Sequence, residues 1–279
     1  MPASPLISPE ALRQALADAT PPLVLDCGFD LADTEAGARA YAAGHIPGAL
    51  YAHLDRDLSG PKTGRNGRHP LPTREAFAAT LGRWGVTPQR AVVVYDAHGL
   101  PYASRAWWML RWMGHAAVQV LDGGLAAWQA TGGPLSTAST PAQPAAPYPA
   151  GPSTMPTIGS DELLAGAATW TVVDARNAER YRGEIEPLDP VAGRIPGALN
   201  RFFKDNLGPD GRLLPPDRLR AAFDALGAPA GRIVHQCGSG VTACQNLLAM
   251  EVAGLAGSLL YPGSWSEWCS DPRRPVARG

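Results

Sequence analysis

The sequence predicts an α/β fold built from two similar domains in tandem, each a small parallel sheet flanked by helices. The length of 279 residues suits two domains of ordinary size. Hydrophobic residues make up 45% of the chain, enough for packed cores. Short apolar runs alternate with segments of helical periodicity, a pattern typical of a parallel sheet covered on both faces.

Four short motifs recur in the same order in the two halves of the chain, 140 to 149 residues apart. Such a series indicates a duplicated domain. The four pairs are Leu23-Val-Leu-Asp26 with Thr171-Val-Val-Asp174, Gly44-His-Ile-Pro-Gly-Ala-Leu50 with Gly193-Arg-Ile-Pro-Gly-Ala-Leu199, Val92-Val-Val-Tyr-Asp96 with Arg232-Ile-Val-His-Gln-Cys237, and Asp122-Gly-Gly-Leu-Ala-Ala-Trp128 with Pro262-Gly-Ser-Trp-Ser-Glu-Trp268.

Individual elements follow from local pattern. Short apolar runs, mostly rich in β-branched residues, predict strands at 23–26, 91–95, 118–121, 171–174 and 232–236. Apolar residues at helical spacing predict helices at 9–17, 73–84, 104–113, 217–226 and 241–253. Thr73 stands where an N-cap is expected.

Residues 136–154 are rich in Pro, Ala, Ser and Thr, and we expect them to form a linker. The predicted domains are therefore 1–135 and 155–279. We expect the linker to cross the surface of one domain on its way to the other.

Charge and cysteine content exclude several classes of function. The 24 Lys and Arg against 25 Asp and Glu leave a net charge of −1, so the chain is a poor candidate for binding nucleic acid or an anionic membrane. There is no membrane-spanning run and no secretory signal pattern. The four cysteines lack Cys-x-x-Cys spacing, which disfavours a zinc site. We expect a soluble cytoplasmic protein without metal or organic cofactor.

The strongest candidate site begins at Cys237, which a predicted strand delivers into the loop Gly-Ser-Gly-Val-Thr-Ala243. Glycines let backbone N–H groups turn inward, and a helix N-terminus adds positive potential, so such a loop stabilises a thiolate. One alternative is a buried cysteine that merely ends a core strand. A cysteine phosphatase is disfavoured, because it needs an arginine six residues after the cysteine, where this chain has Ala243.

Three motifs together resemble the rhodanese superfamily, in particular its two-domain sulfurtransferases. They are the loop Cys237–Ala243, the repeated Gly-His-Ile-Pro-Gly-Ala element and the ending Gly263-Ser-Trp-Ser-Glu-Trp268. In that family, thiosulfate sulfurtransferases carry basic residues just after the cysteine, and 3-mercaptopyruvate sulfurtransferases carry Gly-Ser-Gly, as here. Thiosulfate is a dianion that benefits from nearby cations, whereas mercaptopyruvate carries one carboxylate and a thiol.

The resemblance implies that only the second domain is catalytic, with Cys237 as nucleophile. Asp96 occupies the matching position in the first domain and cannot carry a sulfane sulfur. Cys27, Cys244 and Cys269 have no comparable loop.

The resemblance also implies the groups that bind the substrate. Arg180 falls at the position that binds the substrate carboxylate, with the loop residues Gly238, Gly240, Val241 and Thr242. A second arginine is usual a few residues later, where this chain has Leu188. Arg182 and Arg194 are candidates to replace it.

Proton transfer is implied to use Ser239 with His69 and Asp55, the last two donated by the first domain. The expected function is transfer of sulfur from 3-mercaptopyruvate, through a Cys237 persulfide, to a thiol, a thioredoxin-like dithiol protein or cyanide. Thiosulfate as donor and a non-catalytic persulfide carrier or sensor remain alternatives, and oligomeric state is open.

Overall fold

The computed structural model describes residues 4–228 and 231–279, which divide into two compact units. Unit 1 holds the chain up to Ser59 together with Pro72–Thr154 and Gly208–Leu213. Unit 2 holds Gly60–Leu71, Met155–Leu207 and Leu214–Gly279. Two segments are thus exchanged between the sequence repeats, and one of them, Gly60–Leu71, carries His69.

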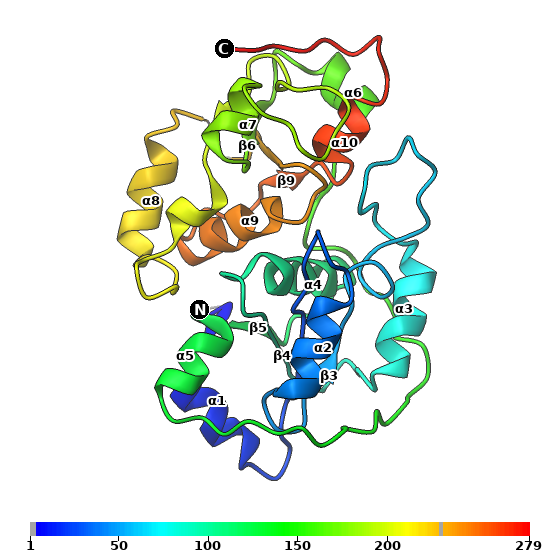
Figure 1. The fold of residues 1–279 in the computed structure, drawn as a ribbon, viewed down its shortest axis with the longest axis vertical. Coiled ribbons are helices and arrows are strands. Elements are labelled where there is room, and N and C mark those ends of the chain that lie inside the picture. The colour runs from blue at the N-terminus through cyan, green and yellow to red at the C-terminus, as the bar shows by residue number, and fades with distance from the viewer. Residues whose placement is uncertain (1–3, 229–230) are drawn as a thin grey trace. The chain divides into compact units, whose positions relative to one another are not determined.

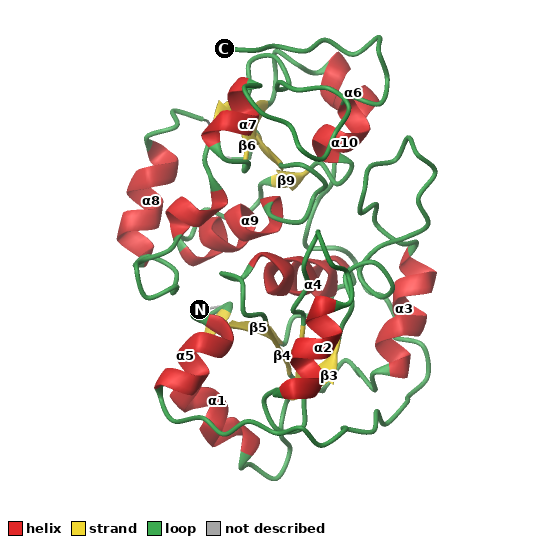
Figure 2. Ribbon diagram, viewed as in Figure 1, coloured by secondary structure: helices red, strands yellow, loops and turns green. Residues whose placement is uncertain are grey.

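Unit 1 contains a five-stranded, fully parallel sheet in the order β1-β5-β4-β2-β3. Figure 2 shows β4 and β5 lying between α4 on one side and α1 with α5 on the other. The elements are β1 (Leu6–Ile7), α1 (Pro9–Leu16), β2 (Leu23–Asp26), α2 (Ala36–Ala43), β3 (Leu50–Tyr51), α3 (Arg74–Arg83), β4 (Val92–Tyr95), α4 (Pro101–Trp112), β5 (Val118–Leu121) and α5 (Gly124–Ala130).

Unit 2 contains a four-stranded parallel sheet in the order β7-β6-β8-β9. Figure 1 labels two of its strands, β6 and β9. Its elements are α6 (Ser160–Ala165), β6 (Thr171–Asp174), α7 (Ala178–Arg182), β7 (Leu199–Asn200), the 3-10 helix η1 (Phe203–Asn206), α8 (Pro216–Asp224), β8 (Ile233–Gln236), α9 (Ala243–Val252), β9 (Leu259–Leu260) and α10 (Ser264–Trp268). The predicted α/β class, with two parallel sheets flanked by helices, is confirmed.

The central strands are buried along their whole length. Every residue of β2, β4 and β8 is buried, as expected for strands covered on both faces by helices. β8 pairs with β6 on one side and β9 on the other, so the strand that precedes Cys237 is central in its sheet. Cys237 therefore follows a strand that is buried and paired on both sides.

The Pro- and Ala-rich segment 136–154 follows the surface of unit 1. Its backbone N–H groups at Ala145 and Tyr148 donate to carbonyls of α3, at distances of 2.8 and 3.0 Å. Gly151 donates to the carbonyl of Met113 at 3.0 Å. These bonds satisfy backbone groups in a segment that has no regular secondary structure.

The segment Gly60–Leu71 is bound to unit 2 by backbone contacts. The Arg68 N–H donates to Ser266 Oγ at 3.0 Å. Gly67, with φ +85°, approaches Gly263 so closely that a Cβ would lie 2.7 Å from the Gly263 carbonyl oxygen. This approach fixes the path of the two residues that follow, Arg68 and His69.

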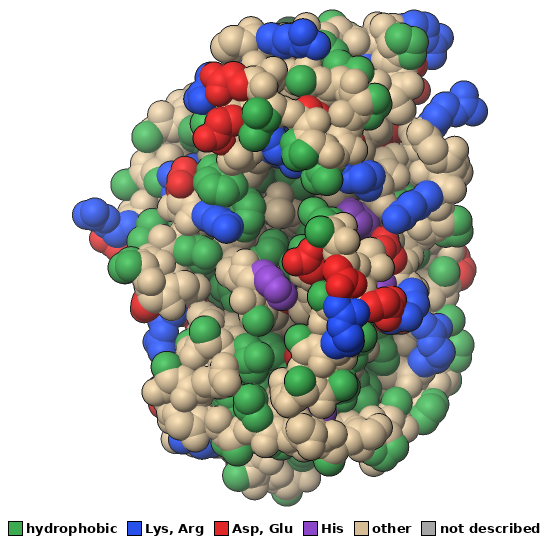
Figure 3. Space-filling model, viewed as in Figure 1, with side chains coloured by type: hydrophobic (Ala, Val, Ile, Leu, Met, Phe, Trp, Pro, Cys, Tyr) green, Lys and Arg blue, Asp and Glu red, His purple; other side chains and the backbone are tan. Residues whose placement is uncertain are grey.

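On the face drawn in Figure 3, Lys and Arg side chains lie interspersed with Asp and Glu side chains. Among the exposed residues, Arg39 pairs with Asp33 and Arg182 with Glu184. Among residues 4–228 and 231–279, the structure contains no helix with the length and apolar character needed to cross a bilayer.

Candidate active site

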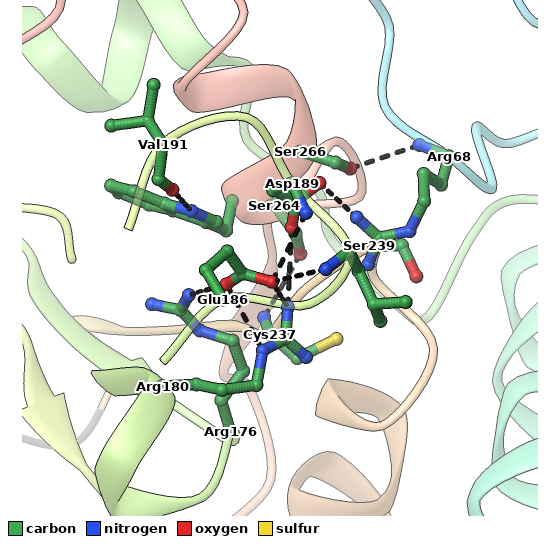
Figure 4. A network of polar contacts seen from close by, with 12 residues as sticks. Arg68, Arg176, Arg180, Glu186, Asp189, Val191, Cys237, Ser239, Ser264 and Ser266 are labelled. Atoms are coloured by element: carbon green, nitrogen blue, oxygen red, sulfur yellow. Dashed lines mark hydrogen bonds and ion pairs between the residues drawn. The ribbon is translucent and has the colours of Figure 1, made fainter. Parts of the chain in front are cut away.

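Cys237 lies directly after β8 and is buried, with 2% of its surface exposed. Its N–H donates to Ser264 Oγ at 3.1 Å, and its carbonyl accepts from the Trp265 N–H at 3.0 Å. The Gly238 carbonyl accepts from the Ser266 N–H at 3.0 Å. Figure 4 shows this group of contacts at the start of α10. The first turn of α10 therefore holds the backbone of Cys237 and Gly238 in place.

Gly240 makes the turn between the cysteine and α9. Its φ is +75°, and a Cβ there would lie 2.2 Å from the carbonyl oxygen of Pro262. Both the left-handed conformation and the close approach require glycine. Because of this turn, α9 begins at Ala243, two residues later than the predicted start at Val241.

The matching loop in unit 1 binds a carboxylate through its backbone. The Asp96 carboxylate there accepts four backbone N–H bonds of 2.8 to 3.0 Å, and Gly99 has φ +84° where Gly240 has +75°. The four donors are His98, Leu100, Tyr102 and Ala103. The loop and the first turn of α4 thus supply four donors to a buried carboxyl group at the position that matches Cys237; burial raises the pKa of this group, and the N–H groups act to lower it.

Ser239 and His69 form a hydrogen-bonded pair in unit 2. The distance between Ser239 Oγ and His69 Nδ1 is 2.8 Å, and the two residues are 6% and 4% exposed. The residues are 170 positions apart in sequence, and the segment Gly60–Leu71 brings them together. The structure thus unites two of the residues singled out from the sequence, on the loop that follows Cys237.

Arg180 lies beside the same loop, in a network of ion pairs. Its guanidinium donates to Glu186 at 2.7 and 3.1 Å and to Asp189 at 3.3 Å. A Cβ built on Gly238 would lie 3.3 Å from Arg180 Nη2, so this cation faces the loop. Arg180 is 16% exposed in its side chain, whereas both carboxylates are 3% exposed.

Arg68 faces Gly238 as well, and sequence reasoning missed it. Its Nη2 would lie 2.8 Å from a Gly238 Cβ, and its Nη1 pairs with Asp189. Figure 4 shows Arg68 and Arg180 approaching the two acidic residues, Glu186 and Asp189, from two sides. Burial raises the pKa of Asp189, while both arginines act to lower it. The one feature of the sequence that could have pointed to Arg68 is its position directly before His69.

Arg176 is the third arginine of this network of ion pairs. It pairs with Asp174 at 2.6 Å and with Glu186 at 3.3 Å, and it lies 4.9 Å from the centre of the Trp265 ring. Its side chain is 1% exposed, so it holds Glu186 in place rather than facing a ligand.

The Leu188 side chain and the two candidate replacement arginines supply no charge to this network. Leu188 is 42% exposed, and it contacts the network through its N–H, which donates to Glu186 Oε1 at 3.1 Å. Arg182 pairs with Glu184 at 2.6 Å, and Arg194 donates to the Gly279 carbonyl and lies over the Tyr181 ring. The inward-facing side chains of this stretch are Glu186 and Asp189, two acids where a base was expected.

The remaining site residues singled out from the sequence divide between the units. Gly238, Val241 and Thr242 lie in the loop between β8 and α9. Asp55 belongs to unit 1, where its N–H donates to His53 Nδ1 at 3.1 Å. Its part in catalysis stays a prediction.

The other three cysteines lie in environments that disfavour ionisation or reaction. Burial raises the pKa of Cys269 to about 11 and that of Cys27 well above its ordinary value. Cys244 is buried in α9 and donates to the Gly240 carbonyl at 3.3 Å. The role of Cys237 as nucleophile stays a prediction.

Comparison with known proteins shows the family of this chain. The family model described as "Rhodanese-like domain" matches residues 8–131 and 160–271. A protein of Pseudomonas aeruginosa named "Probable 3-mercaptopyruvate sulfurtransferase" is 49% identical over 263 residues, covering 92% of each chain. A Mycobacterium tuberculosis protein named "Putative thiosulfate sulfurtransferase SseB" is 39% identical over 286 residues, covering 98% of this chain and 97% of its own.

A solved structure agrees with these sequences. The 3-mercaptopyruvate sulfurtransferase from Leishmania major superposes with a TM-score of 0.85 at 29% identity, covering 98% of this chain and 77% of its own. The matched segments fall one in each sequence repeat, and the second contains the Cys237 loop. The chain belongs to the rhodanese family of sulfurtransferases.

Proposed function

We propose that the protein transfers the sulfur of 3-mercaptopyruvate to a thiol acceptor through a persulfide on Cys237. The observation that carries this proposal is the convergence on one loop of a buried cysteine, a Ser–His pair and two guanidinium groups. The names of the relatives support the same donor. The chemistry has two half-reactions, so ping-pong kinetics are expected.

In the first half-reaction the Cys237 thiolate attacks the sulfur of the donor. A Cys–S–S bond forms, the carbon–sulfur bond breaks, and its electron pair remains on the carbon as the enolate of pyruvate. Arg180 binds the donor carboxylate, since a guanidinium fork matches its geometry. The N–H groups of Ser239, Val241 and Ala243 correspond to those that hold the Asp96 carboxylate, and we assign them to the anionic sulfur.

The proton of the donor thiol ends on the methyl carbon of pyruvate. Ser239 and His69 are the groups we assign to this transfer, because they are joined by a 2.8 Å hydrogen bond beside Cys237. In the second half-reaction an acceptor thiolate attacks the outer sulfur and leaves as a persulfide, which restores the Cys237 thiolate. Glutathione-like thiols and dithiol proteins of the thioredoxin type fit this step.

Thiosulfate is the second candidate donor, and one observation favours it. Two guanidinium groups, of Arg68 and Arg180, face Gly238, and one relative carries a thiosulfate name. Against it, the three arginines of the network (Arg68, Arg176, Arg180) meet three carboxylates (Asp174, Glu186, Asp189), so 3 − 3 leaves no net charge for a dianion.

The test is a steady-state comparison of 3-mercaptopyruvate and thiosulfate with one common acceptor. We expect a larger kcat/KM for mercaptopyruvate, release of pyruvate, and no turnover by Cys237→Ser. Preferential use of thiosulfate would replace the donor in the proposal. Failure of both donors with every acceptor would favour a persulfide carrier. Cys244→Ser is the matched control and should keep activity, because its thiol donates to the Gly240 carbonyl within α9 and a serine hydroxyl can make the same hydrogen bond.

A further inference from the structure

Asp189 is shared between the two cations that face the Cys237 loop. One of its carboxylate oxygens pairs with Arg68 Nη1, and the other lies 3.3 Å from Arg180 Nη2. Asp189 is held in this position by its own N–H, which donates to Glu186 Oε1 at 3.2 Å. With a side chain that is 3% exposed, it is a fixed negative charge between two positive ones.

The position of this charge matters because Gly238 adjoins Cys237. A side chain on Gly238 would meet Arg68 and Arg180 at 2.8 and 3.3 Å, so both guanidinium groups face the residue that directly follows Cys237. A donor that presents negative charge there is attracted by the two arginines and repelled by Asp189. Charges a few ångströms apart in a partly buried site interact strongly enough to select ligands by charge.

We propose that Asp189 is a specificity-determining residue, which together with Glu186 balances the charges of Arg68 and Arg180 beside the Cys237 loop and so disfavours dianionic donors relative to donors with one carboxylate. Arg68 is its partner in this role, and it reaches the site from the segment Gly60–Leu71. The inference rests on the proposed sulfur transfer, and it concerns only the choice between donors.

The measured quantity is the ratio of kcat/KM for thiosulfate to kcat/KM for 3-mercaptopyruvate, in the full-length protein. Asp189→Asn keeps the size and a hydrogen-bonding oxygen but removes the charge. We expect this ratio to rise about tenfold or more, and the gain for thiosulfate to shrink as ionic strength increases. Asp161→Asn is the control, because it removes a carboxylate that is 98% exposed on α6; its ratio should equal that of the wild type.

Arg68→Gln provides an independent arm, since Arg68 is 25% exposed and the variant tests the same charge balance if Asp189→Asn does not fold. Here the ratio should fall about tenfold, and the double variant Arg68→Gln/Asp189→Asn should return toward the wild-type ratio. An unchanged ratio in either folded single variant would overturn the inference. If the wild type uses neither donor, the proposed function fails instead.

Discussion

At the scale of single residues, Arg180 and the Ser239–His69 pair carry the assignments that mutation tests most directly. Replacing Arg180 by Ala removes a guanidinium from beside Gly238, so KM for 3-mercaptopyruvate should rise about tenfold to a hundredfold, with a smaller change in kcat. Arg182→Ala is the matched control, since Arg182 is 42% exposed and pairs with Glu184. An equal effect in both variants would contradict the role of Arg180.

The Ser239–His69 hydrogen bond predicts a coupled effect on turnover. Ser239→Ala and His69→Gln should each lower kcat about a hundredfold, the usual contribution of a positioned proton-transfer group. Because the two act on one proton, the double variant should lose little more than either single variant. Additive losses, or normal kcat in either variant, would show that the pair is structural.

Some site residues could be predicted from the sequence and others could not. Cys237 and the glycines of the loop lie in one short motif that local pattern singles out, whereas Ser239 and His69 were named from the resemblance to the rhodanese superfamily. Arg68 and Asp189 are 121 residues apart, and neither stands in a motif that marks a site. Their meeting depends on the path of Gly60–Leu71 along unit 2, which no local pattern encodes.

At the scale of secondary-structure elements, the longer strands were predicted closely because they are continuous apolar runs. The predictions for β2, β5 and β6 match the observed bounds, and 91–95 and 232–236 are each one residue too long at the N-terminal end. The two-residue strands β1, β3, β7 and β9 were missed, because so short a run has no periodicity. α4 begins at Pro101 rather than Ser104, since proline suits the first turn of a helix.

The loop between β8 and α9 predicts a strong effect of adding one methyl group. Gly240→Ala should destabilise the protein by about 2 kcal/mol or more beyond Gly197→Ala, as measured by urea unfolding. Both glycines have φ near +75°, but a Cβ on Gly197 meets nothing within 4 Å, whereas one on Gly240 meets a carbonyl oxygen at 2.2 Å. Equal losses would mean that conformation alone requires Gly240.

β8 also contains His235, which is fully buried, with Nε2 2.9 Å from Met250 Sδ. Burial lowers its pKa to about 3, so the folded protein keeps the ring neutral while the unfolded chain protonates it below pH of about 6.5. Stability from this residue is therefore present above pH 6.5 and lost as pH falls toward 3. Between pH 7 and 5, wild type should lose about 2 kcal/mol more unfolding free energy than His235→Leu. Parallel pH dependences in the two proteins would contradict this.

At the scale of the whole molecule, the two repeats carry different residues at the matching loop position. Unit 1 has the Asp96 carboxylate, which accepts four backbone N–H bonds, whereas unit 2 has Cys237. Asp96→Ala leaves four buried N–H groups without their acceptor, so unfolding free energy should fall by about 3 kcal/mol or more. Asp18→Ala, an exposed aspartate of unit 1, should change it by less than about 0.5 kcal/mol. Similar losses in the two variants would remove the structural role assigned to Asp96.

The central claim is that Cys237 carries the transferred sulfur, and a single half-reaction tests it. The protein is mixed with 3-mercaptopyruvate without acceptor, and pyruvate release is measured together with the mass of each cysteine-containing peptide. We predict one pyruvate per protein and the mass of one added sulfur atom on the Cys237 peptide, neither of them in Cys237→Ser. Sulfur on another cysteine, or pyruvate release that persists in Cys237→Ser, would contradict the account.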